Sequence, residues 1–197
     1  GEEQGGELNE HACWVVDPID GTSNYSSGNP NCAILVSLVV RGEPVLALTD
    51  IPLMDMQMSA VAGGPVMLNG DALPPVHSRT TSAWQVGVGS VGWDERQRFP
   101  ARMRLGLVGA LAETELRPRI SGSVGVDLAF VAQGIYQAAV SFSPHIWDNA
   151  AGVCLARCAG ARVTDAVGKP WHMRSVGALL GTPEAHARTL STMKSIV

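Results

Sequence analysis

The sequence has little charge and no long apolar run, and both absences narrow the classes of protein it can specify. Only 16% of its 197 residues are charged, and the formal net charge is −4. With 46% hydrophobic residues, such a chain buries a core rather than staying disordered. The basic surface of a duplex-binding protein is missing, which argues against a nucleic-acid partner. Because no apolar run reaches the roughly 18 residues of a membrane span, we expect no membrane partner either.

Cysteine is scarce and offers no zinc site. The four cysteines are Cys13, Cys32, Cys154 and Cys158. The last two would share one face of a helix, but no further Cys or His pair supplies the other ligands of a structural zinc. We therefore interpret all four as buried free thiols in a reducing, cytoplasmic compartment.

Strand-like and helix-like stretches alternate along the chain. Short apolar runs predict strands at 14–16, 32–40, 44–49, 66–68, 72–73, 84–91, 137–142, 162–164 and 176–180. Helices are expected in the arginine-rich tract near Pro100, at 124–132, at 149–158 with Asp148 as N-cap, and from Pro183 onward. Turn residues at Arg41-Gly42-Glu43 and Asn69-Gly70 indicate hairpins. This pattern predicts an α/β fold with mixed sheets.

A small polar stretch at 78–82 is the predicted lobe boundary, which divides the chain into an N-terminal lobe, 1–78, and a C-terminal α/β lobe, 79–197. The basic tract that follows includes Arg98, Arg102 and Arg104. Because acidic residues stand beside it, we interpret it as the solvated face of a helix.

One twelve-residue string carries the chemistry: Trp14-Val15-Val16-Asp17-Pro18-Ile19-Asp20-Gly21-Thr22-Ser23-Asn24-Tyr25. A buried strand would deliver Asp17 to its end, and Pro18 would stop the ladder so that Asp20 returns near Asp17. Two carboxylates and the Ile19 carbonyl then form the hard oxygen set that Mg²⁺ prefers. Beyond Gly21, a short turn or helix would offer free N–H groups to a phosphate. Taken alone, Asp-x-x-Asp-Gly is more often a polar turn closed by an Asx cap, and the whole twelve-residue string is far more specific.

The string resembles the signature of the inositol monophosphatase family, the lithium-sensitive, magnesium-dependent phosphatases. A second family motif is matched by Trp147-Asp148-Asn149-Ala150-Ala151-Gly152 with Ala159-Gly160, and a third by Gly1-Glu2-Glu3. Asn69-Gly70 and Ser121-Gly122-Ser123 fall where the family has comparable elements. The resemblance covers essentially the whole chain and implies the family's layered sandwich of mixed sheets and helices.

The resemblance also implies a role for each motif residue. Glu2, Asp17 and the Ile19 carbonyl would hold a first Mg²⁺, and Asp17, Asp20 and Asp148 a second, with two or three Mg²⁺ per site. The residues implied to bind phosphate or substrate are Asp20, Gly21, Thr22, Ser23, Ser123 and Asp148. Thr22, whose hydroxyl would orient the attacking water, and Glu2 are the implied catalytic residues. The implied reaction is hydrolysis of a small polyol, sugar or nucleotide phosphate by metal-activated water, inhibited by Li⁺ and Ca²⁺.

Structural rather than functional interpretations exist for two of these residues and for His145, which is a further candidate for a substrate contact. Asp148 is also a common N-cap type, Glu2 at a chain end is usually only solvated, and His145 is more simply a structural histidine near a helix start.

Two departures from the family pattern bear on function. Family members begin several dozen residues earlier, with helices and an aspartate that pairs with the motif threonine. If this chain begins at Gly1, we expect weak catalysis and an exposed apolar face where those helices would pack. Inositol-specific members also have an acidic residue at the place of Ser141, and a serine cannot supply a charged acceptor for substrate hydroxyls.

Other functions stay open at this point. Fructose-1,6-bisphosphatase or 3′-nucleotidase specificity lies within the same family, and a non-catalytic role with protein or RNA machinery is an alternative of another class. The resemblance suggests a homodimer, which the expected exposed apolar residues of the 84–91 strand would not contradict.

Overall fold

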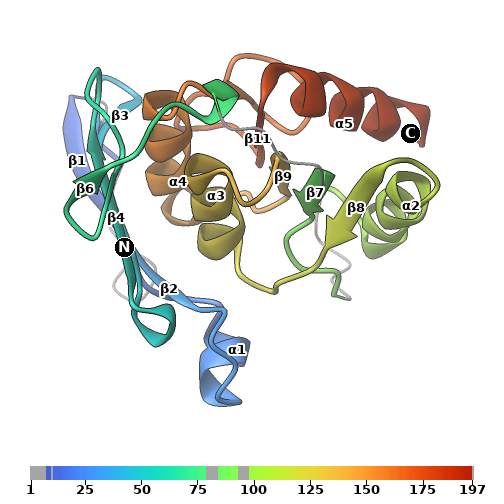
Figure 1. Cartoon of the computed structure of the whole chain (residues 1–197), viewed down its shortest axis with the longest axis horizontal. Coiled ribbons are helices and arrows are strands. Elements are labelled where there is room, and N and C mark those ends of the chain that lie inside the picture. The colour runs from blue at the N-terminus through green and yellow to red at the C-terminus, as the bar shows by residue number, and fades with distance from the viewer. Residues whose placement is uncertain (1–7, 10, 79–83, 93–97, 197) are drawn as a thin grey trace.

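A computed structural model describes residues 8–9, 11–78, 84–92 and 98–196, in which sheets and helices alternate in layers (Figure 1). The first layer is an antiparallel sheet in the order β1 (Ala12–Asp20), β2 (Ala33–Val40), β3 (Glu43–Ile51), β4 (Met56–Val61), β5 (Met67–Leu68) and β6 (Asp71–Ala72). The second sheet has the order β10 (Arg162–Thr164), β11 (Ala178–Gly181), β9 (Ala138–Ser141), β7 (Trp84–Gly87) and β8 (Leu116–Arg119).

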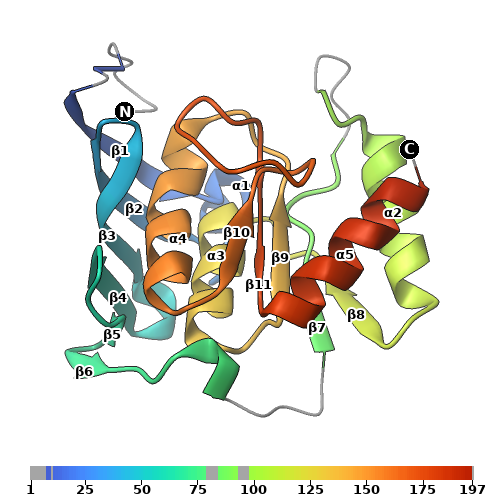
Figure 2. The ribbon, with the colours of Figure 1, turned by 90° about the horizontal axis from the view of Figure 1, so that it is seen from above.

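Helices α3 (Val124–Gln133) and α4 (Ile146–Cys158) lie between the two sheets, and α2 (Ala101–Ala112) and α5 (Pro183–Ser195) cover the far face of the second sheet (Figure 2). The shorter helical turns are α1 (Thr22–Ser26), η1 (Pro52–Met54) and η2 (Val76–Ser78). The layered α/β architecture confirms the predicted fold class. No helix in the described part of the chain is both long and apolar enough to cross a membrane.

Both predicted hairpins form. Arg41 and Gly42 have φ of 52° and 81° in the turn between β2 and β3, and Asn69 and Gly70 have φ of 49° and 93° between β5 and β6. Two successive positive φ values give the turn twist that tight hairpins need. The structure adds β4, which the sequence reasoning did not identify.

The strand around Asp17 is longer than expected. Pro18 does not stop it: β1 continues to Asp20, with one register irregularity between Asp17 and Asp20. Because β2 is the one described strand that pairs with β1, β1 forms an edge of this sheet as described, and a missing N–H at Pro18 costs little there.

The outer face of the first sheet is apolar and open. Trp14, expected in a buried strand, is 60% exposed, and Ile34 and Val61 on the same face are also exposed. The inner face carries Leu35 and Met58, both buried against the helix layer. Among the described residues, no helix covers the outer face (Figure 2).

The second sheet is covered on both faces. β7 runs parallel to both β8 and β9 and lies between them, and Val86 and Val88 are fully buried. The strand predicted at 84–91 is shorter than expected and ends at Gly87. Since Val86 and Val88 are buried, the prediction that the valines of this stretch are exposed is wrong for these two residues.

Three other features of the chain bear on the sequence predictions. Helix α4 contacts strands of both sheets, and part of the predicted boundary, residues 79–82, lies outside the described residues. The division into lobes at residue 78 therefore stays a prediction.

Arg104 is only 3% exposed, so the expected solvated face is wrong for this residue. All four cysteines are free, but Cys13 and Cys158 are half-buried rather than buried.

Candidate active site

The register irregularity in β1 brings two carboxylates to one side of the sheet. Side chains three residues apart in a regular strand point to opposite faces. Here Asp17 pairs with Leu35 and Asp20 with Ala33, so an advance of three residues along β1 corresponds to only two residues along β2. This extra residue is a β-bulge, and it turns Asp20 to the same inner face as Asp17.

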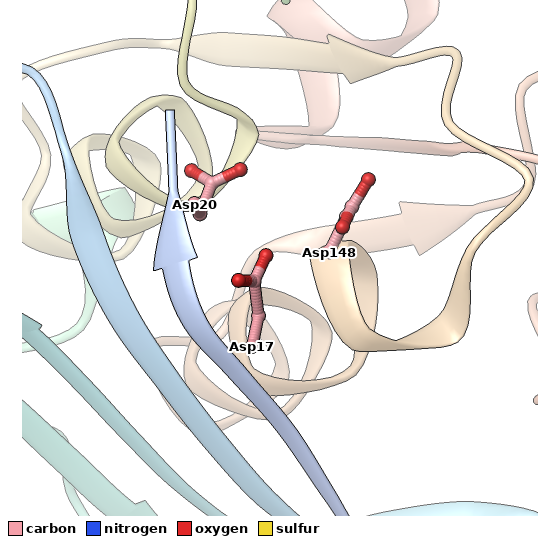
Figure 3. A group of neighbouring side chains, drawn as sticks. All are labelled: Asp17, Asp20 and Asp148. Atoms are coloured by element: carbon pink, nitrogen blue, oxygen red, sulfur yellow. The ribbon is translucent and has the colours of Figure 1, made fainter. Parts of the chain in front are cut away.

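Asp148 completes a cluster with these two residues. Carboxylate oxygens of Asp17, Asp20 and Asp148 all lie within 4.8 Å of one another, and the side chains converge from β1 and α4 (Figure 3). Asp17 and Asp20 are buried, and Asp148 is half-buried. Like charges this close repel unless a cation or a proton lies between them. Three carboxylates of this kind fit a hard divalent cation such as Mg²⁺.

Hydrogen bonds hold the two β1 carboxylates in place. Asp17 Oδ1 accepts from the Ile19 N–H at 3.0 Å. Asp20 Oδ2 accepts from the Gly125 N–H at 2.8 Å and from the Ser123 hydroxyl. Ser123 is also the N-cap of α3, where its Oγ accepts from the Val126 N–H at 3.2 Å. The start of α3 therefore fixes Asp20 from the side opposite to its own strand.

Asp148 lies in the first turn of α4 rather than at its cap. The helix begins at Ile146 and its N-cap is His145, so the prediction of Asp148 as N-cap is wrong. A carboxylate in the first helical turn is favoured by the partial positive charge of that helix end. The earlier start of α4 leaves Asp148 able to point toward Asp17 and Asp20 (Figure 3).

The implied phosphate residues follow β1 directly. Gly21 has φ of 78°, and a Cβ there would lie 2.7 Å from the Asn31 carbonyl oxygen, so only glycine fits this position. The Thr22 hydroxyl donates to the Ile19 carbonyl at 2.9 Å. This hydrogen bond joins the hydroxyl that is implied to orient the attacking water to the carbonyl that is implied to hold Mg²⁺. Thr22 and Ser23 are exposed at the start of α1.

Glu2, together with the whole Gly1-Glu2-Glu3 motif, lies outside the described residues. Its roles as metal ligand and catalytic residue stay predictions.

A cavity of about 530 Å³ adjoins the carboxylate cluster. Its lining includes Asp20 and Asp148 together with Arg98, Arg104 and His145. The His145 ring stacks on Trp147, with ring centres 4.5 Å apart. Ser141, at the position where the resemblance places an acidic substrate contact in inositol-specific members, is 1% exposed and is absent from the described lining.

Sequence reasoning missed a third buried carboxylate, Asp127. Burial raises the pKa of Asp127 to about 7, the nearby Asp20 adds to the shift, and hydrogen bonds from Ser121 and the Gly89 N–H oppose it. The Gly89 N–H donates to Asp127 Oδ2 at 3.1 Å. A signal was available, because Asp127 is the single charged residue in α3.

Comparison with known proteins agrees with this site. The sequence model of the inositol monophosphatase family matches residues 1–197. The chain is 47% identical over 197 residues to "Probable inositol 1-monophosphatase ImpA" of Mycobacterium tuberculosis, covering all of this chain and 73% of that protein. It is 36% identical over 165 residues to "Nus factor SuhB" of Xylella fastidiosa, covering 84% of this chain and 59% of that one.

Solved structures share the architecture. The fold matches Thermotoga maritima IMPase TM1415 with a TM-score of 0.84 and 25% identity, over 98% of this chain and 73% of that one. It matches the suhB protein of Bartonella henselae with a TM-score of 0.85 and 25% identity, over 99% and 75% of the two chains.

The layered fold and its buried carboxylate cluster are those of a metal-dependent phosphatase. The chain belongs to the inositol monophosphatase family, and its activity is that of a phosphoric monoester hydrolase.

Proposed function

We propose that the chain hydrolyses small phosphate monoesters with two or three Mg²⁺ ions held by Asp17, Asp20 and Asp148, joined by the Ile19 carbonyl and Glu2. The observation that carries this proposal is the convergence of three carboxylates within 4.8 Å of one another. Bound Mg²⁺ lowers the pKa of a coordinated water and neutralises charge on the phosphoryl oxygens.

The residues of the chain do the positioning. Asp17 and Asp20 are preset by the β1 bulge and by hydrogen bonds to backbone N–H groups, so they lose little freedom when a cation binds. The Thr22 hydroxyl donates a hydrogen bond to the Ile19 carbonyl, which leaves the lone pairs of its oxygen available to accept a hydrogen bond from water and so orient that water. Gly21, Thr22 and Ser23 are our proposed phosphate contacts, with Ser123 supporting them through Asp20.

The proposed substrates are small polyol, sugar or nucleotide phosphates. The ImpA relative carries inositol 1-monophosphatase in its name, which supports inositol 1-phosphate as a substrate. The described cavity lining has no carboxylate besides Asp20 and Asp148, so nothing in it is reserved for a pair of inositol hydroxyls. We therefore include sugar phosphates and nucleotide 3′-phosphates in the same proposal.

A phosphate-release assay tests the proposal. Wild-type protein should release phosphate from at least one ester of a panel that contains inositol 1-phosphate, and chelation of Mg²⁺ should abolish the release. Asp17→Asn should lower kcat/KM by more than about 100-fold, because it removes a ligand charge from the cation site. The matched control is Asp55→Asn, at an exposed residue with φ of 52° that asparagine tolerates. Equal activity of Asp17→Asn and wild type would refute the site.

A second candidate is a binding role with RNA or its protein machinery, supported by the relative named Nus factor SuhB. A gel-shift assay with structured RNA at physiological salt tests direct RNA binding. A homodimer and a cytoplasmic location also stay predictions. Light scattering after size-exclusion chromatography decides the first, and cell fractionation decides the second.

A further inference from the structure

A second cavity lies on the far side of the five-stranded sheet, between the two helices that cover it. Helices α2 and α5 lie side by side there (Figure 2), and a cavity of about 450 Å³ lies between them and the 165–169 turn. The described lining contains none of the three clustered carboxylates. A volume of this size is within the range of small-molecule sites. The cavity is therefore a candidate binding site separate from the carboxylate cluster.

The floor of this cavity is apolar. It consists of Phe99, Met103, Ala166, Leu190 and Met193. Phe99 and Met193 are only 5% and 3% exposed, so the floor is continuous with the packed core between α2 and α5. Methionine side chains are flexible and polarisable, which lets Met103 and Met193 follow the shape of a chain-like ligand. An apolar chain placed on this floor would remove apolar surface of both molecules from water.

Two cationic side chains border the apolar floor. Arg98 precedes α2, and Lys194 lies in the last turn of α5, so the two come from different segments to the same cavity. Both are exposed. The guanidinium carbon of Arg98 lies 5.9 Å from the centre of the Phe99 ring, which places a positive charge directly beside the floor. The cavity thus combines an apolar surface with a cationic rim.

The described surroundings do not neutralise this rim. The described lining contains no acidic residue, and among the described residues no carboxylate forms an ion pair with Arg98 or Lys194. Asp165 lies in the adjoining turn, but its Oδ1 accepts from the Val167 and Lys169 N–H groups at 3.0 and 2.8 Å. An anionic head group at the rim therefore meets two positive charges from the described lining.

We propose that this cavity binds a small amphipathic carboxylate, of which a free medium-chain fatty acid is the simplest member. Its apolar chain lies on Phe99 and Met193, and its carboxylate is held by Arg98 and Lys194 through charge-assisted hydrogen bonds. A neutral apolar molecule would make no use of the cationic rim, and a small hydrophilic anion would leave the apolar floor in water.

The proposed site adjoins the cavity beside the carboxylate cluster. Arg98 belongs to the lining of both cavities. Phe99 packs on Phe142 of the other cavity, with ring centres 5.2 Å apart. The two cavities therefore share a wall, but they take ligands of different chemistry, and the carboxylate site goes beyond the proposed hydrolysis.

Isothermal titration calorimetry with a matched set of eight-carbon ligands tests the charge requirement. With every ligand below its micelle-forming concentration, wild-type protein should bind octanoate about three- to tenfold more tightly than octan-1-ol, and octylammonium most weakly. From hexanoate to octanoate the affinity should rise about two- to fourfold per methylene, because each methylene adds apolar contact. Equal affinity for octanoate and octan-1-ol, or no gain with chain length, would overturn the proposal.

Charge-removing variants test the rim. Arg98→Gln and Lys194→Gln should each reduce the preference for octanoate over octan-1-ol, and the double variant should abolish it, while the affinity for octan-1-ol stays unchanged. The matched controls are Arg102→Gln and Lys169→Gln, because both residues are exposed and neither belongs to the described lining. If the controls reduced the preference as much as the rim variants, a rim contact would be refuted.

A cavity-filling variant tests the floor. Val167 is 39% exposed at the edge of this cavity, so Val167→Trp places a large ring in it without replacing a core residue. This variant should lose octanoate binding and keep the circular dichroism spectrum of the wild type. Unchanged octanoate binding to folded Val167→Trp would show that the ligand binds elsewhere. If the variant does not fold, the rim variants still decide. Binding heat is measured without a phosphate ester, so its absence overturns this site and leaves the proposed hydrolysis untouched.

Discussion

The two sheets differ in how much of each is covered. The five-stranded sheet has helices on both faces, and its strands β9 and β11 are buried throughout. Among the described residues, the six-stranded sheet has helices on one face only (Figure 2). Its β2 nevertheless has the sequence AILVSLVV, an apolar run interrupted by Ser37 alone and of the kind found in strands buried on both faces.

The two sheets therefore contribute differently: the five-stranded sheet belongs mainly to the buried core, and the six-stranded sheet supplies two residues of the carboxylate cluster. The covered sheet and the helix layer supply most of the buried core, including the fully buried Leu179. The open sheet supplies Asp17 and Asp20, which lie at its edge strand, where a bulge is tolerated. Two of the three clustered carboxylates thus come from an edge strand, and Asp20 is held from the other side by the start of α3.

The largest predicted effect comes from truncating leucines in covered positions. Leu179→Ala in β11 and Leu35→Ala on the inner face of β2 should each lower the free energy of unfolding by about 2–5 kcal/mol, because each leaves a cavity in a packed core. Urea unfolding followed by circular dichroism measures both. A loss below about 1 kcal/mol for Leu179→Ala would contradict the picture of a sheet packed on both faces.

An effect of intermediate size is expected in the pH dependence of the free energy of unfolding. It arises from His186 in α5, the helix that covers the far face of the five-stranded sheet. Burial, with a smaller contribution from Arg162, lowers the pKa of His186 to about 4. The Thr164 hydroxyl donates to the Asp165 carbonyl and therefore accepts from His186 Nε2. Among the described residues, Nδ1 has no hydrogen-bond partner, so its protonation would bury an unpaired N–H.

The sign of this dependence follows from the lowered pKa. The unfolded chain binds a proton on this histidine near pH 6.5 and the folded chain only near pH 4, so the unfolding free energy falls as the pH drops through this window. The expected loss is on the order of 2 kcal/mol at pH 4. Asp127, with its raised pKa, acts in the opposite direction. Comparison with His186→Gln isolates the histidine, and identical pH profiles for the two proteins would contradict its role.

The smallest effect is expected on the open face. Leu38 is half-buried and points outward from β2, so Leu38→Ala should lower the unfolding free energy by about 1 kcal/mol or less. The same urea titration gives the comparison with Leu35→Ala in the same strand. A loss equal to that of Leu35→Ala would mean that the outer face is covered in solution.

Local signals in the sequence predicted much of the fold and part of the site. Gly42 and the Asn69-Gly70 pair mark turns that need positive φ, and Pro183 begins α5 as predicted. The spacing of Asp17 and Asp20, together with the second motif around Asp148, predicted three carboxylates in one place, and the structure brings them together. These features depend on residues close in sequence or on whole motifs.

The features that sequence reasoning missed depend on contacts between distant segments. Arg104 looks solvated beside its acidic neighbours, yet α2 packs on the second sheet and turns this side chain into the cavity wall. An edge strand tolerates Pro18 and the bulge in β1. Which strand lies at the edge is decided by the order of the whole sheet and is not encoded in the local sequence. The outward exposure of Trp14 also follows from the layer order rather than from the local apolar run.

Direct titration of divalent cation binding tests the central claim, that the β1 bulge and the first turn of α4 together form a cation site. Isothermal titration calorimetry with Mg²⁺ should show binding to wild-type protein and to Asp55→Asn. Binding should be at least about tenfold weaker in Asp17→Asn and in Asp148→Asn, because each loses one charged ligand. Equal Mg²⁺ affinity in all four proteins would contradict the site.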